Sequence, residues 1–115
     1  MAKIVVCGSR SITDYDLLKN TLDRLIDKTS DAIISGGAKG VDQLAEKYAK
    51  ENNISFEVIK ADWENLGKSA GMKRNIVMIN KADKVIALWN GMSPGTNFSI
   101  DYAKKHNKLM EIIYV

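Results

Sequence analysis

The sequence predicts an α/β protein built on a Rossmann-like, doubly wound parallel sheet of five strands in the order 3-2-1-4-5, with helices on both faces. Runs of β-forming residues recur at intervals of roughly 25 to 30 residues, the length of one strand–helix unit. The inner runs are almost continuously apolar, which is typical of parallel strands buried on both faces. Right-handed crossovers between such strands favour the stated order.

The expected strands are short runs of β-forming residues that lie between helical patterns. Each inner run is bounded by polar or glycine-containing segments, which are expected to form the connections. The expected strands cover residues 3–8, 31–36, 55–60, 83–89 and 108–115.

The first helix is expected where apolar side chains form a single stripe, over residues 17–26. Thr13 and Asp16 have the spacing of a capping box, although Asp takes the place of the usual Glu or Gln. This pair predicts that Thr13 caps the start of the helix.

Three further helices are expected between the remaining strands. Residues 41–49 carry apolar side chains at i, i+3, i+4, i+7 and i+8, which places them on one buried face. Residues 69–81 are interpreted as a third helix, and residues 96–106 as a fourth with a weaker pattern. The one long stretch without a clear pattern, residues 61–68, is expected to be irregular.

Composition indicates one ordinary folded domain covering residues 1–115. Hydrophobic residues make up 45% and charged residues 27% of the chain, which argues against disorder. The formal net charge is +3, without the block of like charges that marks a nucleic-acid-binding tail. Cys7 is the one cysteine, so no internal disulfide forms. We expect no signal peptide, no membrane span and a cytoplasmic location.

A ligand site is expected beyond the carboxyl ends of the strands, at the point where the winding reverses. Glycine-containing loops follow the second and fourth strands, and their amides together with a helix N-terminus favour a phosphate. Arginines from the first loop and the third helix would clamp the same phosphate. The predicted ligand-binding residues are Gly8, Ser9, Arg10, Ser35, Gly36, Gly37, Ala38, Gly40, Asp42, Lys68, Arg74, Asn75, Gly91, Ser93, Gly95 and Thr96.

Simpler interpretations stand beside these. The loop at residues 35–40 also suits a plain strand-to-helix turn, and Arg10 also suits an ordinary surface position. Trp63 and Trp89 are able to stack on a base, but the position of Trp89 at a strand end favours core packing. His106 is interpreted as a surface residue near a helix end. We expect neither a metal ion nor a cofactor, because the sequence lacks a Cys/His cluster and an HExxH motif.

Taken together, GSR, SGGAKGVDQLAEKYA, ADWENLGKSAGMKRN and GMSPGT resemble the SLOG superfamily, and most closely its branch related to YspA and YpsA. The resemblance implies a Rossmann-like fold that binds nucleotides or nucleotide-derived molecules, including ADP-ribose-like ligands. The Lonely Guy members of this superfamily are phosphoribohydrolases with a PGGxGTxxE signature and a preceding helical arginine. Arg74 matches that arginine, and Gly95 and Thr96 match the GT pair. Ser99 stands in the place of the glutamate.

The loss of that glutamate leaves catalysis open. Cleavage of an N-glycosidic bond develops positive charge on the ribose, which a carboxylate stabilises and a serine does not. Asp42, Asp62, Glu64 and Asp101 are the candidate substitutes. For Asp42, a role at the helix N-terminus is favoured over catalysis.

Three functional hypotheses follow. The first is a domain that binds a nucleotide-derived small molecule as a sensor, a carrier or a sequestering protein. The second is an N-glycosidase that releases a base from a nucleoside 5′-monophosphate. The third is a nucleic-acid-binding module like the DprA members of the superfamily, which the lack of a basic stripe disfavours. Small size and the resemblance also suggest a homodimer.

Overall fold

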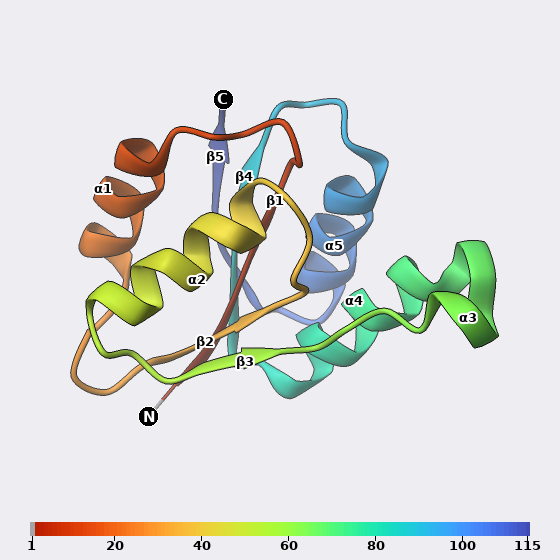
Figure 1. The fold of residues 1–115 in the computed structure, drawn as a ribbon, viewed down its shortest axis with the longest axis horizontal. Helices are drawn as coiled ribbons and strands as arrows, with labels where there is room; N and C mark the ends of the chain where they lie inside the picture. The colour runs from red at the N-terminus through yellow and green to blue at the C-terminus, as the bar shows by residue number, and fades with distance from the viewer. Residues whose placement is uncertain (1) are drawn as a thin grey trace.

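The computed structural model describes residues 2–115 and contains one five-stranded parallel sheet in the order β3-β2-β1-β4-β5 (Figure 1). The predicted fold class and strand order are therefore confirmed. The pairing of β4 with the edge strand β5 contains a register shift between Val85 and Ile86. The strands are β1 (Lys3–Gly8), β2 (Ala32–Ser35), β3 (Phe56–Val58), β4 (Lys84–Trp89) and β5 (Leu109–Tyr114).

Helices cover both faces of the sheet, as Figure 1 shows. On one face lie α1 (Tyr15–Leu25) and α2 (Val41–Glu51), and on the other lie α4 (Ala70–Lys81) and α5 (Pro94–Lys105). No helix within residues 2–115 is both long enough and apolar enough to cross a membrane.

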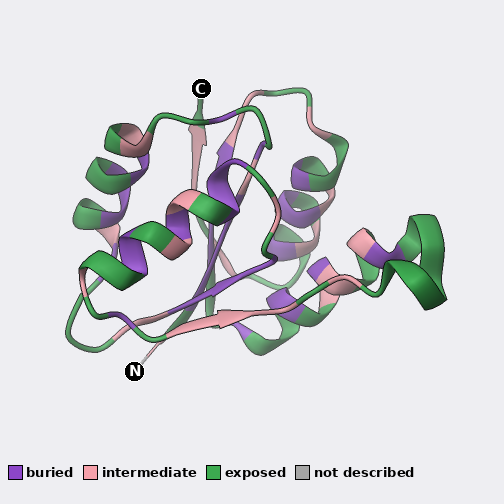
Figure 2. Cartoon of the chain, in the orientation of Figure 1, coloured by how far each residue is buried: buried purple, intermediate pink, exposed green. Residues whose placement is uncertain are grey.

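The core consists of two apolar layers, one on each face of the sheet. Neighbouring residues of a strand point to opposite faces, so Ile4 and Val6 pack under α1 and α2, while Val5 packs against α4 and α5. Because both faces are covered, the central strands have no polar side and read as continuous apolar runs. Figure 2 shows the same arrangement, with the buried residues concentrated along the central strands and on the inner sides of the helices.

The stretch expected to be irregular, residues 61–68, contains helical turns instead. It forms the short helix α3 (Trp63–Leu66), and the 3₁₀ turn η1 (Gly67–Ser69) leads from it into α4. Asp62 caps α3, because its side chain accepts a hydrogen bond from the Asn65 amide at 3.3 Å. The expectation failed because a four-residue helix is too short to show a hydrophobic period. Figure 1 shows α3 projecting away from the sheet.

The start of α1 also differs from the expectation. The N-cap is Asp14, whose Oδ1 accepts a hydrogen bond from the Leu17 amide at 3.1 Å, and Thr13 lies one residue outside the helix. The predicted capping box was therefore wrong by one position. An aspartate is as good a cap as a threonine, and the spacing alone does not decide between adjacent capping residues.

We expect Asp14→Ala to lower the free energy of unfolding by about 1 kcal/mol, because the Leu17 amide then loses its acceptor. Urea denaturation followed by circular dichroism measures the change. Thr13→Ala is the matched control, since Thr13 is exposed and lies outside the helix. A larger loss in the Thr13 variant than in the Asp14 variant would contradict this assignment of the cap.

Candidate ligand-binding site

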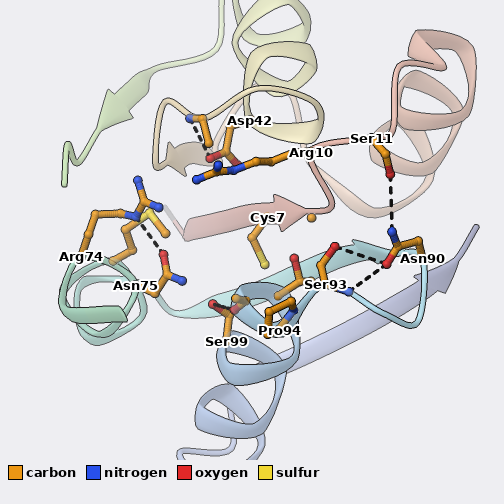
Figure 3. A pocket seen from close by; sticks show the side chains of 15 residues that line it. Cys7, Arg10, Ser11, Asp42, Arg74, Asn75, Asn90, Ser93, Pro94 and Ser99 are labelled. Atoms are coloured by element: carbon orange, nitrogen blue, oxygen red, sulfur yellow. Dashed lines mark hydrogen bonds between the residues drawn. The ribbon is translucent and has the colours of Figure 1, made fainter. Parts of the chain in front are cut away.

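A cavity of about 500 Å³ opens at the carboxyl ends of β1 and β4, where the winding of the sheet reverses (Figure 3). A cavity of this size falls in the range of small-molecule sites. Three segments far apart in the sequence supply its polar wall, namely the loop after β1, the start of α2 with the glycine loop before it, and the start of α5. The α4 helix supplies the remaining side, which contains an arginine and an asparagine.

The cavity brings together many of the predicted site residues. Those that line it are Gly8, Arg10, Ala38, Asp42, Arg74, Asn75, Ser93, Gly95 and Thr96. The other predicted residues lie outside its lining, and they are Ser9, Ser35, Gly36, Gly37, Gly40, Lys68 and Gly91. Lys68 is exposed in the turn before α4, and Gly91 is exposed at the tip of the loop after β4.

Sequence reasoning missed several lining residues. Asn90 directly follows β4, and Met78 lies one turn after Arg74 on α4, so position alone could have indicated both. Cys7 also lines the cavity, and burial, followed by the charge of Asp42, raises the pKa of its thiol to about 12. Cys7 is therefore a protonated wall residue and not a nucleophile.

Ser9 joins the two loops that flank the crevice. Its buried Oγ accepts hydrogen bonds from the Asn90 amide at 3.1 Å and from Ser93 Oγ at 2.9 Å. Asn90 Oδ1 in turn accepts from the amides of Met92 at 2.8 Å and Ser93 at 3.0 Å, which folds the loop toward α5. Ser9 therefore holds the loop after β4 against the loop after β1 and positions the start of α5.

The glycine loop before α2 packs directly on the loop after β1. Gly40 is the N-cap of α2 and has a φ of 75°. A Cβ atom at this position would lie 2.5 Å from the Ser9 carbonyl oxygen and 2.6 Å from that of Arg10. Only glycine permits both this backbone conformation and this close approach.

Asp42, in the first turn of α2, closes that loop from within. Its Oδ2 accepts a hydrogen bond from the Ala38 amide at 3.1 Å, and its residue surface is only 7% exposed. Burial raises the pKa of its carboxyl group, and the Ala38 N–H and the charge of Arg74 oppose that rise. The carboxylate therefore places negative charge on the wall of the cavity. It also accepts the hydrogen bond of the Ala38 amide, which was expected to bind a phosphate.

The raised pKa of Asp42 has a consequence for stability. The folded state binds this proton more tightly than the unfolded state, so the stabilisation is complete below the unfolded pKa, near 3.9, and is lost as the pH rises through the folded pKa. We expect Asp42→Asn to gain stability relative to the natural protein as the pH rises from about 3 toward 7. Urea denaturation at several pH values measures this difference, in which the other carboxyl groups cancel. A difference that is independent of pH would contradict the shift.

Arg74 joins α4 to the glycine loop across the cavity. Its Nη1 donates to the Gly36 carbonyl oxygen at 2.7 Å, and its Nε donates to Asn75 Oδ1 at 2.8 Å. The guanidinium lies so close to Gly36 that a Cβ there would be 2.6 Å from Nη1. Burial lowers the pKa of Arg74, while the charge of Asp42 partly offsets this effect. Arg74 stays cationic, since an arginine does not deprotonate in a protein.

Arg10 is the second cation of the cavity, and it is exposed. Figure 3 shows its side chain extending along the cavity from the loop after β1. The positive charge of Arg10 lowers the pKa of Arg74 through electrostatic repulsion. None of the ion pairs within residues 2–115 includes Arg10 or Arg74. Two cations that face one cavity without a partner carboxylate in an ion pair favour an anionic ligand.

The start of α5 presents donors to the same cavity. Pro94 is its first residue, and Gly95 and Thr96 follow in the first turn, where amide N–H groups have no intrahelical acceptor. In the part of the chain that the structure describes, the N-cap Ser93 makes no side-chain capping bond to them. Ser93 Oγ bonds Ser9 and Asn90 instead. The positive end of the α5 dipole is therefore open to a ligand.

The candidate substitutes for the missing glutamate differ in whether they line the cavity. Ser99 lines the cavity, but its Oγ donates to the Gly95 carbonyl oxygen at 3.2 Å. Asp62, Glu64 and Asp101 are exposed on α3 and α5, outside the lining. Asp42 thus combines a carboxylate, burial and a position on the cavity wall.

The two tryptophans lie apart from the lining of the cavity. Trp89 is half-buried, donates through Nε1 to the Ser93 carbonyl oxygen at 3.1 Å and packs against Tyr114 with ring centroids 5.9 Å apart. Trp63 is 53% exposed and packs against Gly71. Within residues 2–115, no group of three or more His, Cys, Asp or Glu residues is arranged to hold a metal ion.

The strand order and the cavity at the reversal point define the class as a doubly wound, Rossmann-like α/β protein with a polar cavity at its switch point. The chain belongs to the YspA, cpYpsA-related SLOG family, whose sequence model matches residues 2–66. The resemblance seen in the sequence motifs is therefore confirmed.

A relative and two solved structures extend this comparison. The Gene 61 protein of Mycobacterium phage D29 is 34% identical over 115 residues, covering 91% of this chain and 90% of that protein. DNA processing protein A from Helicobacter pylori superposes with a TM-score of 0.73 and 23% identity over 94% of this chain. DNA processing protein A from Streptococcus pneumoniae gives a TM-score of 0.79 and 17% identity over 97% of this chain.

The solved relatives are larger proteins. The chain spans 63% of the Helicobacter pylori chain and 49% of the Streptococcus pneumoniae chain. At these identities the likeness establishes the shared fold. The Helicobacter pylori protein binds single-stranded DNA.

Proposed function

We propose that this chain is a SLOG-type domain that binds a nucleotide or a nucleotide-derived small molecule, such as a nucleoside phosphate or an ADP-ribose-like compound. Such a domain would act as a sensor, a carrier or a sequestering protein. Family membership supports a module that binds nucleotides or nucleic acid. The cavity at the switch point supports a small molecule within that range.

One observation carries the proposal most directly. The open amide end of α5, at Gly95 and Thr96, lines the same cavity as the guanidinium groups of Arg10 and Arg74. A helix N-terminus and two cations together attract an anion more strongly than either feature alone. A phosphate is the anion that suits both the amides and the guanidinium geometry.

The hydrogen bonds favour α5 over the glycine loop as the phosphate site. The Ala38 amide already donates to Asp42, and a phosphate placed there would lie against a buried carboxylate. The start of α5 offers amides without such a partner. We therefore place the phosphate at Gly95 and Thr96, with Arg10 closing over it.

Ligand-dependent thermal melting tests the proposal. A ligand that binds only the folded state raises the melting temperature, with a dependence on ligand concentration that gives the affinity. The panel contains nucleoside mono- and diphosphates, ADP-ribose and inorganic phosphate. We expect at least one nucleotide to raise the melting temperature, and we expect Arg10→Ala to weaken its binding about tenfold or more.

Lys39→Ala provides the matched control for Arg10→Ala. Lys39 is an exposed cation in the glycine loop and lies outside the lining of the cavity. Its removal lowers the net charge by the same amount and should leave affinity within about twofold. Equal losses in the two variants would indicate nonspecific attraction to positive charge. A panel in which no nucleotide changes the melt would refute the proposed function.

Asp42 gives a specific reason to keep N-glycosidase activity as the second candidate. It places a buried carboxylate with a raised pKa on the wall of the same cavity that Ser99, which stands in the place of the signature's glutamate, also lines. A carboxyl group in this environment is suited to acid–base chemistry at a glycosidic bond. Release of free base from nucleoside 5′-monophosphates, followed by chromatography and abolished in Asp42→Asn, would establish this activity.

Single-stranded DNA is the alternative ligand suggested by the shared fold with DNA processing protein A. Tight DNA binding with a steep dependence on salt concentration, without any response to mononucleotides, would favour it over our proposal. Homodimerisation and a cytoplasmic location remain predictions, and sedimentation analysis measures the first of them.

A further inference from the structure

We infer that Asp42 recognises a ribose hydroxyl of the bound nucleotide, so that the site binds the ribonucleotide more tightly than the deoxy counterpart that lacks this hydroxyl. The inference rests on the proposed function and specifies the class of ligand. It follows from the different chemistry of the two sides of the cavity, which Figure 3 shows with Asp42 and Ser93 on opposite walls.

The wall formed by α5 offers donors. Gly95 and Thr96 line the cavity at the positive end of the helix, and Arg10 adds a guanidinium from the loop after β1. The wall formed by α2 offers an acceptor, because an ionised Asp42 has only lone pairs to present. A ligand that fills both sides needs an anionic group for the first and a hydrogen-bond donor for the second.

Asp42 retains capacity for such a donor. The carboxylate has about four acceptor sites. The Ala38 amide uses one of them, at 3.1 Å, and hydrogen bonds from the Gly36 amide and the Ser35 hydroxyl, which also favour the ionised form, use two more. Asp42 lines the cavity, and we assign its remaining acceptor site to a donor on the ligand. Desolvation raises the free energy of this carboxylate, and a further hydrogen bond from the ligand would offset part of that cost.

A neighbouring donor favours a hydroxyl over an amino group as the partner. Asn75 is buried and lines the cavity, and its Oδ1 accepts from Arg74 Nε at 2.8 Å, which leaves its amide nitrogen as a donor. Arg74 connects the two residues, because its charge also acts on Asp42. A hydroxyl both donates and accepts, and so it suits a cavity that offers an acceptor from α2 and a donor from α4. An amino group of a base only donates.

The sugar is the part of a nucleotide that carries such hydroxyls next to the phosphate. With the phosphate at the start of α5, a ribose would extend across the cavity toward Asp42, while the base would point outward. The carboxylate also repels a second phosphate, which disfavours a ligand with phosphates at both sides of the cavity.

Isothermal titration calorimetry with a ribonucleoside 5′-monophosphate and its 2′-deoxy and 3′-deoxy counterparts tests the inference. For the natural protein, we expect at least one deoxy compound to bind about tenfold more weakly or worse, because it leaves a buried acceptor unpaired. For Asp42→Asn, we expect the ribose preference to fall to about twofold or less, with the deoxy compound bound as well as before or better. Lys39→Ala is the control that should keep the full preference.

The outcomes separate the inference from the proposed function. If the natural protein binds ribo- and deoxyribonucleotides equally well, or if Asp42→Asn keeps the full preference, the inference fails while nucleotide binding stands. If neither ribo- nor deoxyribonucleotides bind, the proposed function fails and the inference falls with it. Even if the Asp42 variant does not fold, equal binding of ribo- and deoxyribonucleotides by the natural protein would overturn the inference.

Discussion

Gly40→Ala should lower the free energy of unfolding by about 3 kcal/mol or more. Two costs combine at this position. The φ of 75° is unfavourable for any residue with a Cβ atom, and the new methyl group would lie 2.5 Å from the Ser9 carbonyl oxygen and 2.6 Å from that of Arg10. These neighbours are backbone atoms, so relief requires α2 or the loop after β1 to move. Urea denaturation followed by circular dichroism measures the loss.

Gly91→Ala separates the two costs. Gly91 has a φ of 82°, but a Cβ there would meet no atom within 4 Å in the described part of the chain. We expect this variant to lose about 1–2 kcal/mol from backbone conformation alone. Similar losses in the two variants would show that the close approach of α2 to the loop after β1 adds nothing to stability.

Arg74→Ala should weaken nucleotide binding between about tenfold and a hundredfold. The substitution removes a cation from the cavity and releases two hydrogen bonds, to the Gly36 carbonyl oxygen and to Asn75 Oδ1. It also removes the cation that opposes the raised pKa of Asp42, so Asp42 should titrate at higher pH in the variant. Calorimetry measures the affinity. The pH dependence of stability measures the second effect.

We expect Arg74→Ala to destabilise the folded protein as well. Loss of the Arg74 bond leaves the Gly36 carbonyl without its partner, so we also expect a loss of about 1–3 kcal/mol in unfolding free energy. Lys73→Ala is the matched control, because Lys73 is an exposed cation on the same helix outside the lining of the cavity. Unchanged affinity in Arg74→Ala would remove Arg74 from the site. A loss of equal size in Lys73→Ala would assign the effect to overall charge.

Much of the fold could be predicted because its signals are local and repeated. Each inner strand is a continuous apolar run, and the stripe at residues 41–49 matches the face of α2 that packs on the sheet. The failures are equally local. The N-cap of α1 is Asp14 and not the predicted Thr13. The helix α3 was not predicted, because four residues are too few to show a hydrophobic period.

The candidate site was predicted in outline, and its hydrogen bonding was not. The place of the cavity follows from strand order, because residues after β1 and β4 must meet where the winding reverses. Glycine content, however, does not reveal which groups the amides of a loop bind. The Ala38 amide binds Asp42, and Ser9 bonds the loop after β4, whereas both had been assigned to a ligand.

By itself, the sequence determined the parallel doubly wound sheet, the order of its strands and the loops that border the cavity, because apolar periodicity and glycine placement are written into short segments. Only the tertiary structure decided which polar groups remain for a ligand. Arg74 meets Gly36 across 38 positions of the chain, and Asn90 meets Ser9 across 81. Such pairings depend on how the folded sheet brings distant loops together, and each one removes a donor or an acceptor from the site.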